Sequence, residues 1–201
     1  MAGLIAKFYL PEFGAVLIDG VDTRELSSPW LHCHLGIVPQ QNHLFAGSIL
    51  ENIRVVRPDA ERDEVREALR RLDCLETIEA IPNGLDAEVG ERGSSLSLGQ
   101  RQLVCFARAM IADPRILILD EATSAIDPLT EARTQKAMHA LMTGRTSFVL
   151  AHRLSTLRHA HRVIVMSKGE IIEQGAPDEL LAAGGPFADL WKHASGAEEG
   201  A

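Results

Sequence analysis

Apolar residues recur at helical spacing through the first half of the chain. Residues 59–72 place Val65, Ala68, Leu69 and Leu72 on one face among charged neighbours, as in an amphipathic helix. A longer apolar stripe follows at 103–111, and Pro114 ends it. Residues 2–9 read as the end of another amphipathic helix, which Pro11 stops. The pattern therefore predicts a mostly helical region from about 48 to 113.

Short continuous apolar runs dominate the second half of the chain. Three of them, typical of strands buried on both faces, cover residues 116–119, 147–150 and 163–166. Helical segments separate the first two runs, and a short one at 155–159 precedes the third, so we expect β–α–β crossovers and a parallel sheet. A turn at 168–169 predicts a hairpin into 170–173, and shorter runs at 16–18 and 35–38 predict two further strands.

The order of these elements predicts an α/β fold in which a helical insertion interrupts the core. A chain of 201 residues is long enough for one such domain, so we expect residues 1–201 to form a single domain. Its α/β core would span 1–45 and 113–201, and its helical subdomain would span 46–112.

Composition narrows the class of protein. A net charge of −8 and an isoelectric point near 5.5 argue against a nucleic-acid-binding module, which needs a basic surface. The three cysteines lie far apart without metal-site spacing, which favours reduced thiols. No apolar run approaches the ~18 residues of a membrane-spanning helix, so a link to a membrane would come through a partner.

The sequence ILILDE places two carboxylates, Asp120 and Glu121, directly after a buried strand. In open α/β sheets ligands bind at the carboxyl ends of strands. Asp120 could hold Mg²⁺ through water there, and Glu121 could orient or deprotonate an attacking water. Buried strands also often end in acidic residues for no catalytic reason, so this motif alone leaves both interpretations open.

The sequence GSSLSLGQRQ at 93–102 comes directly before the long apolar helix. Ser97 is placed to cap that helix, whose free N–H groups would then face outward beside a glycine. Such an end can bind a phosphate, although an ordinary capped helix explains the same residues.

Taken together, the motifs resolve this ambiguity. Gln40 at the end of GIVPQ, LSLGQ at 96–100, ILILDE at 116–121, SAID at 124–127 and His152 after a strand follow in this order along the chain. This series resembles the Q-loop, signature motif, Walker B, D-loop and H-loop of the ATP-hydrolysing domain of ABC transporters, over nearly the whole chain. The resemblance implies a P-loop NTPase-type parallel sheet core with an inserted helical subdomain.

The resemblance implies catalytic and metal-binding roles for four residues. Asp120 and Gln40 would hold Mg²⁺, and Gln40 would also contact the attacking water. Glu121 would be the catalytic carboxylate, and His152 would hold the γ-phosphate of ATP. ATP and Mg²⁺ are therefore the expected cofactors.

It also implies a shared nucleotide site. Ser97, Leu98, Gly99 and Gln100 would bind the γ-phosphate of ATP held mainly by an opposite subunit, and Asp127 would lie at the dimer seam. Leu98 departs from the second glycine that is commoner in the family, a change that exporters tolerate. The partner would be a second nucleotide-binding domain, identical or different, and no nucleic acid.

Two further segments resemble exporters. AEVGERG, Ala87 to Gly93, resembles the loop through which exporter-type proteins contact their transmembrane domains, and residues 175–191 resemble the exporter tail. We therefore expect an ATPase that couples hydrolysis to transmembrane export, at the cytoplasmic face of the plasma membrane. Import is a weaker alternative. A soluble ABC protein acting on DNA or ribosomes fits the acidic charge poorly.

One family motif is missing from residues 1–201, namely the Walker A loop G-x-x-x-x-G-K-[ST], whose N–H groups and lysine cradle phosphates. Residues 2–9 resemble the helix that follows this loop, so the loop and its strand would precede Met1. We therefore expect the chain alone to bind ATP poorly, to be inactive and to fold marginally. The alternative function is a non-catalytic half that supplies LSLGQ to a complete partner's ATP site.

Overall fold

The computed structural model describes residues 1–120, 128–151 and 154–198. It divides into two compact units, Met1–Leu150 and Ala151–Ala201. The mixed α/β fold class predicted from the sequence is confirmed by a parallel sheet and its surrounding helices. The predicted boundaries of the core and of the helical subdomain stay predictions.

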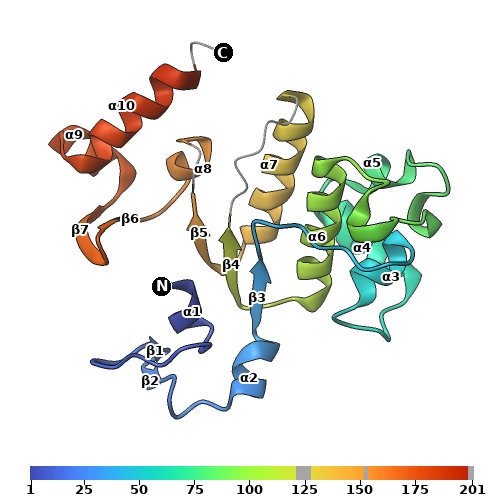
Figure 1. Ribbon diagram of the computed structural model, residues 1–201, viewed down its shortest axis with the longest axis horizontal. Coiled ribbons are helices and arrows are strands. Elements are labelled where there is room, and N and C mark those ends of the chain that lie inside the picture. The colour runs from blue at the N-terminus through green and yellow to red at the C-terminus, as the bar shows by residue number, and fades with distance from the viewer. Residues whose placement is uncertain (121–127, 152–153, 199–201) are drawn as a thin grey trace. The chain divides into compact units, whose positions relative to one another are not determined.

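A three-stranded parallel sheet forms the centre of the first unit. Its strands are β3 (Leu35–Val38), β4 (Ile116–Asp120) and β5 (Thr146–Leu150), in the order β3-β4-β5. Helix α7 (Pro128–Met142) connects β4 to β5, as the predicted crossover requires (Figure 1). Because all three strands run in one direction, the residues that follow them lie along one edge of the sheet.

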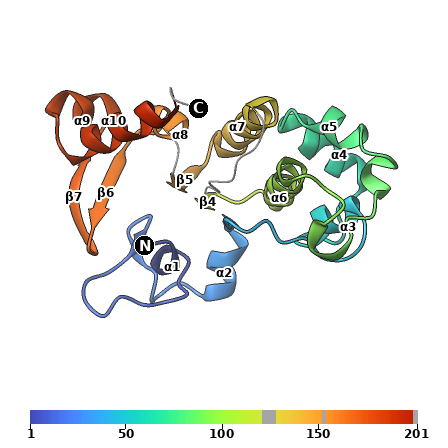
Figure 2. The ribbon, with the colours of Figure 1, turned by 45° about the horizontal axis from the view of Figure 1, so that its top comes forward.

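Helices fill the chain between β3 and β4. They are α3 (Ile49–Arg54), α4 (Arg62–Arg71), α5 (Leu75–Glu79) and α6 (Leu98–Ala112), with short 3₁₀ helices at Gly84–Asp86 and Glu91–Gly93. Helix α6 lies between the sheet and α3–α5 in both ribbon views (Figures 1 and 2). It buries the predicted apolar stripe, including Leu103, Phe106 and Met110. One hydrophobic core therefore runs from the helices through α6 to Leu117 and Leu119 of β4.

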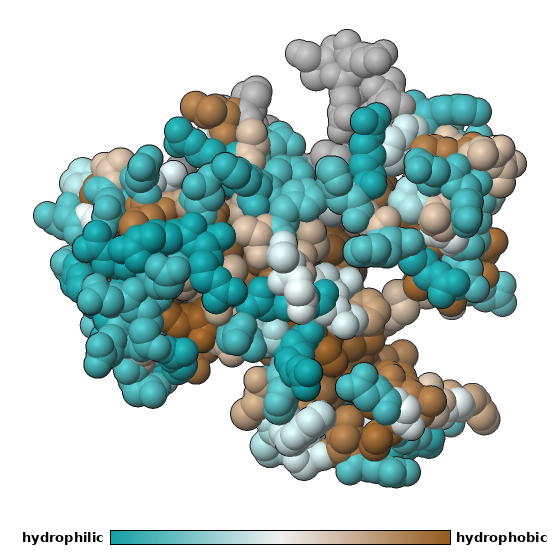
Figure 3. Space-filling view, turned by 180° about the vertical axis from the view of Figure 1, so that it is seen from behind, coloured by the Kyte–Doolittle hydropathy of each residue, from teal (hydrophilic) through white to brown (hydrophobic). Residues whose placement is uncertain are grey.

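The first 34 residues form small elements that leave apolar side chains exposed. They are α1 (Ala2–Ile5), the antiparallel pair β1 (Leu17–Ile18) and β2 (Val21–Asp22), and α2 (Ser28–Cys33). Helix α1 ends well before Pro11, because Lys7 adopts a left-handed backbone with φ of 56°. Apolar side chains gather at the surface of this segment, at the bottom of the view in Figure 3.

The second unit holds α8 (Leu154–Arg158), β6 (Val163–Ser167), β7 (Glu170–Gly175), α9 (Pro177–Ala183) and α10 (Pro186–Glu198). The predicted hairpin is confirmed: β6 pairs antiparallel with β7, and Lys168 and Gly169 turn the chain with positive φ. The run 163–166 was expected in the parallel sheet. It finds its ladder partner in the hairpin instead, since the tight turn brings 170–175 alongside it. No helix in the described part of the chain is long and apolar enough to cross a membrane.

Candidate functional site

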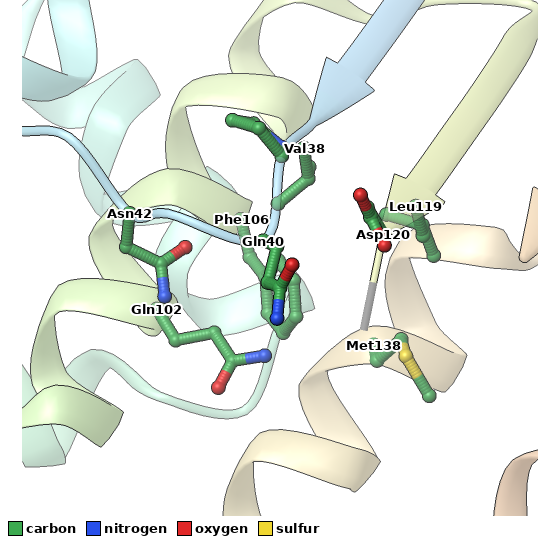
Figure 4. A pocket seen from close by; sticks show the side chains of 9 residues that line it. Val38, Gln40, Asn42, Gln102, Phe106, Leu119, Asp120 and Met138 are labelled. Carbon is green, nitrogen blue, oxygen red and sulfur yellow. The ribbon is translucent and has the colours of Figure 1, made fainter. Parts of the chain in front are cut away.

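Gln40 and Asp120, the two residues predicted to hold Mg²⁺, line one pocket at the carboxyl edge of the sheet. Asp120 is the last residue of β4, and Gln40 follows β3, whose Val38 pairs with Leu119. The parallel register explains why residues so far apart in sequence meet here. Figure 4 shows the Gln40 amide between Asp120 on one side and Gln102 on the other.

The pocket has an apolar wall and a polar side. Val38, Leu119 and Met138 and the ring of Phe106 supply the apolar wall, whereas Gln40, Asn42, Gln102 and Asp120 supply the polar groups. Asp120 is half-buried and Gln40 is exposed. A carboxylate and an amide oxygen fit Mg²⁺, which binds through one or two carboxylates and fills its other positions with water and phosphate oxygens. The described residues contain no cluster of three or more acidic, histidine or cysteine ligands.

Gln102 and Asn42 were not predicted from the sequence. Gln102 lies one helical turn before Phe106 on α6, so both side chains face the pocket. A polar residue within the apolar stripe of this helix was the available signal. Asn42 carries no such signal, because its place depends on the path of the chain after β3.

Ser97 caps α6 as predicted. Its hydroxyl accepts a hydrogen bond from the Gln100 amide at 3.2 Å, and the Gln100 side-chain oxygen accepts one from the Ser97 amide at 2.9 Å. The Ser97 hydroxyl proton and the Gln100 side-chain NH₂ group take no part in this capping box and are left as donors. Together with the positive helix end, these donors suit an anion such as a phosphate.

Gly99 has a packing role that the sequence did not reveal. The glycine is buried, and a Cβ atom built on it would lie 2.1 Å from Cγ2 of Thr130 on α7. Absence of a side chain therefore lets α6 and α7 approach each other. The predicted contact of Gly99 with a phosphate stays a prediction, as does that of the half-buried Leu98.

The Ala87–Gly93 loop is fixed at its base and charged on its outer side. The Ala87 carbonyl accepts a hydrogen bond from Ile49, and the Val89 amide donates to Gly47, both at 3.0 Å. Val89 is fully buried, whereas the side chains of Glu88, Glu91 and Arg92 are exposed. The loop is thus rigidly attached to the start of α3 and presents charges outward.

Three predicted site residues, Glu121, Asp127 and His152, lie outside the described residues. Glu121 follows Asp120 directly, and His152 follows Ala151 beyond the end of β5. Their predicted roles stay predictions.

Comparison with known proteins identifies the family. The ABC transporter family model matches residues 1–124. The Bacillus subtilis ABC transporter ATP-binding protein YknV is 48% identical over 96% of this chain and 32% of its own length. The beta-(1→2)glucan export ATP-binding/permease protein NdvA of Rhodopseudomonas palustris is also 48% identical, over 93% of this chain and 31% of its own.

A solved structure agrees with these relatives. It is a bacterial Atm1-family ABC exporter with ATP bound, with a TM-score of 0.86 and 40% identity, covering 96% of this chain and 34% of that one. The chain thus spans about a third of the length of the relatives it matches. Its motif series, its fold and these matches agree: the chain belongs to the ABC transporter family and resembles the ATP-binding part of its exporters.

Proposed function

We propose that this chain is the ATP-binding and ATP-hydrolysing part of an ABC exporter and couples hydrolysis to transmembrane transport. The observation that carries the proposal is the pocket at the carboxyl edge of the sheet, beside α6. Gln40 and Asp120 line this pocket together. These two residues stand 80 positions apart in the numbering, so the fold rather than local sequence joins them.

Each residue at the sheet edge has a defined task in this proposal. Mg²⁺, when bound, neutralises charge on the phosphate oxygens of ATP. The Asp120 carboxylate and the Gln40 amide oxygen hold that ion, and Gln40 also orients the attacking water. Glu121, the next residue in the chain, accepts the proton of that water, and His152 donates a hydrogen bond to the γ-phosphate.

The N-terminus of α6 serves a second nucleotide site. The capping box leaves the Ser97 hydroxyl proton and the Gln100 NH₂ group as donors, which would bind the γ-phosphate of ATP held mainly by another nucleotide-binding domain. Asp127 would lie at the seam between the two domains. Two such domains, identical or different, would therefore complete each other's sites.

The Ala87–Gly93 loop would contact the transmembrane domains. Its fixed base supports this role, because a rigid loop transmits movement better than a mobile one. Phe45 is 59% exposed and lies two residues before Gly47, whose carbonyl accepts the hydrogen bond from the Val89 amide. An apolar side chain and charged loop residues at one place suit a protein partner. This arrangement would hold the chain at the cytoplasmic face of the membrane.

A second candidate function rests on the start of α6, where LSLGQ leaves donors for a phosphate of ATP held by another domain. The chain would then be a non-catalytic half that supplies the signature motif to the ATP site of a complete partner. Residues 1–201 by themselves contain no G-x-x-x-x-G-K-[ST] segment, so in this proposal they bind ATP poorly and are inactive apart from such a partner.

One experiment separates the two functions. The complex that contains this chain is purified from its own cells through a tag placed after Ala201, and ATP turnover is measured. If the chain is catalytic, Glu121→Gln stops turnover but leaves ATP bound. If it is a non-catalytic half, Glu121→Gln leaves turnover intact and Ser97→Ala lowers it.

A matched control isolates the phosphate contact of Ser97 from its capping role. Ser27 caps α2 with the same chemistry, accepting a hydrogen bond from the Trp30 amide at 3.3 Å. Ser27→Ala should cost about 1 kcal/mol of stability, as should Ser97→Ala. Only Ser97→Ala should lower turnover. Unchanged turnover in both Glu121→Gln and Ser97→Ala would contradict both functions.

A further inference from the structure

Arg108 of α6 attaches the segment that follows Gln40 to the helix. Its guanidinium donates to the carbonyl oxygens of His43 at 3.2 Å and Asn52 at 2.9 Å, and to the Asn52 side-chain oxygen at 3.2 Å. The same group lies 5.5 Å from the centre of the Phe45 ring. Arg108 therefore contacts the segment at two places and α3 at a third.

Asn52 completes this attachment from α3. Its side-chain oxygen accepts from the Phe45 amide at 2.8 Å, and its NH₂ group donates to the carbonyls of Phe45 at 2.9 Å and Ser48 at 3.0 Å. Asn52 is 1% exposed. With Arg108 as a second donor to its oxygen, all four hydrogen-bonding positions of this amide are used. We call Asn52 and Arg108 the α3–α6 clamp.

Burying the Arg108 guanidinium costs free energy, which indicates that the α3–α6 clamp has a role beyond packing. Burial lowers the pKa of Arg108, because the partly buried guanidinium loses water. Among the described residues no carboxylate pairs with it. Its planar set of donors fits several oxygens at once, and a lysine, with one ammonium group, cannot reproduce that fit.

Gln40 lies between two fixed points of the chain. Before it, Val38 is held in the sheet by its pairing with Leu119; after it, His43 is held by Arg108. Helix α6 also contributes Gln102 to the pocket that Gln40 and Asp120 line. The helix that begins at Ser97 thus fixes the chain on the far side of Gln40.

We propose that Asn52 and Arg108 are positioning residues that act through Gln40. By holding the chain after Gln40 on α6, they set where its amide stands relative to Asp120. This inference rests on the proposed role of Gln40 in holding Mg²⁺.

The test measures the half-saturating Mg²⁺ concentration of the purified complex in two ways, from ATP turnover and from direct binding of Mn²⁺ in place of Mg²⁺. This concentration does not depend on how much of the sample is active, so a loss of folded protein leaves it unchanged. Arg108→Lys and Asn52→Ala should each raise it roughly tenfold, the size typical of losing a group that orients a metal ligand. Gln40→Ala should raise it too, and adding Arg108→Lys to Gln40→Ala should raise it no further.

Arg145→Lys is the matched control. The Arg145 side chain is 6% exposed and donates to the carbonyls of Pro114 at 3.0 Å and Leu141 at 2.7 Å, away from residues 40–48. Its substitution should leave the half-maximal Mg²⁺ concentration unchanged. If Gln40→Ala raises that concentration but Arg108→Lys does not, the positioning role is overturned and the proposed function stands. If Gln40→Ala changes nothing, the role of Gln40 fails and this inference fails with it.

Discussion

At the scale of single residues, position 99 has no room for a side chain. The nearest obstacle, Cγ2 of Thr130, belongs to a β-branched residue whose methyl group has few alternative positions. A glycine there does more than give a phosphate access to the helix end. It also lets α6 and α7 pack together, so a substitution should change stability as well as nucleotide binding.

We expect Gly99→Ala to destabilise the fold by about 1–3 kcal/mol, because the added methyl group forces α6 and α7 apart. Chemical denaturation of the purified chain measures this loss. Thr130→Ser removes the obstructing methyl group and keeps the hydroxyl, so Gly99→Ala in that background should cost much less. Equal losses in the two backgrounds would show that the contact with Thr130 is not the cause.

Sequence reasoning found residues whose chemistry is visible along the chain. Asp120 and Ser97 each adjoin an element with a clear hydrophobic pattern, which fixes where they stand. Asn52 and Arg108 were missed because their partners are carbonyl oxygens, which every residue carries and no pattern reveals. Gln102 was missed although it lies one turn before Phe106, on the face of α6 that the apolar pattern marks.

At the scale of elements, α10 is joined to the hairpin by one charged residue. The half-buried carboxylate of Glu173 on β7 accepts a hydrogen bond at 2.7 Å from the amide of Phe187, in the first turn of α10. Free amide groups at a helix start favour a negative charge. Phe187 also enters the small core of this unit with Val163, Val165 and Leu180.

Glu173→Gln should lower the stability of the second unit by about 1 kcal/mol, since it removes the charge that the helix start favours. Denaturation followed by the fluorescence of Trp191 on α10, in a Trp30→Phe background that leaves Trp191 as the one tryptophan of the sequence, reports this loss. Glu170→Gln is the control, because Glu170 lies on the same strand with its side chain exposed. A loss as large in Glu170→Gln would mean that general charge, not the bond to Phe187, is responsible.

Elements were predicted well where the hydrophobic pattern was clear, as in α6 and β4. The pairing of the run 163–166 with the strand after Gly169 was predicted correctly, because the turn at Lys168 and Gly169 identifies the hairpin. Its place in the parallel sheet was not confirmed: among the described residues that sheet holds β3, β4 and β5, and an apolar strand carries no mark of which further neighbour it pairs with.

At the scale of the whole molecule, the apolar surface of the first 34 residues is the feature that we expect to cause aggregation. Phe13 is 90% exposed and Leu17 is 61% exposed. Apolar groups gathered at a surface favour association with other molecules.

We expect the isolated chain to associate at high concentration, and Phe13→Ser with Leu17→Ser to reduce that association. Both side chains are exposed, so stability should change by no more than about 0.5 kcal/mol. Static light scattering measures the association. Leu190→Ser, which removes a side chain 60% exposed on α10, is the control and should leave scattering unchanged. Scattering that persists in the double variant would place the sticky surface elsewhere.

The pairing of β3 with β4 has a consequence for how the protein is made. Leu35 pairs with Ile116, so the sheet closes only after all of α3–α6 has been synthesised. A single helix forms fast, whereas closing a long loop between two strands is slow. During translation, residues 35–38 therefore have no strand partner until residues 116–119 are made, although the helices between the two strands can form earlier. Slower synthesis through residues 49–112 lengthens the time for which this apolar segment is open to chaperones.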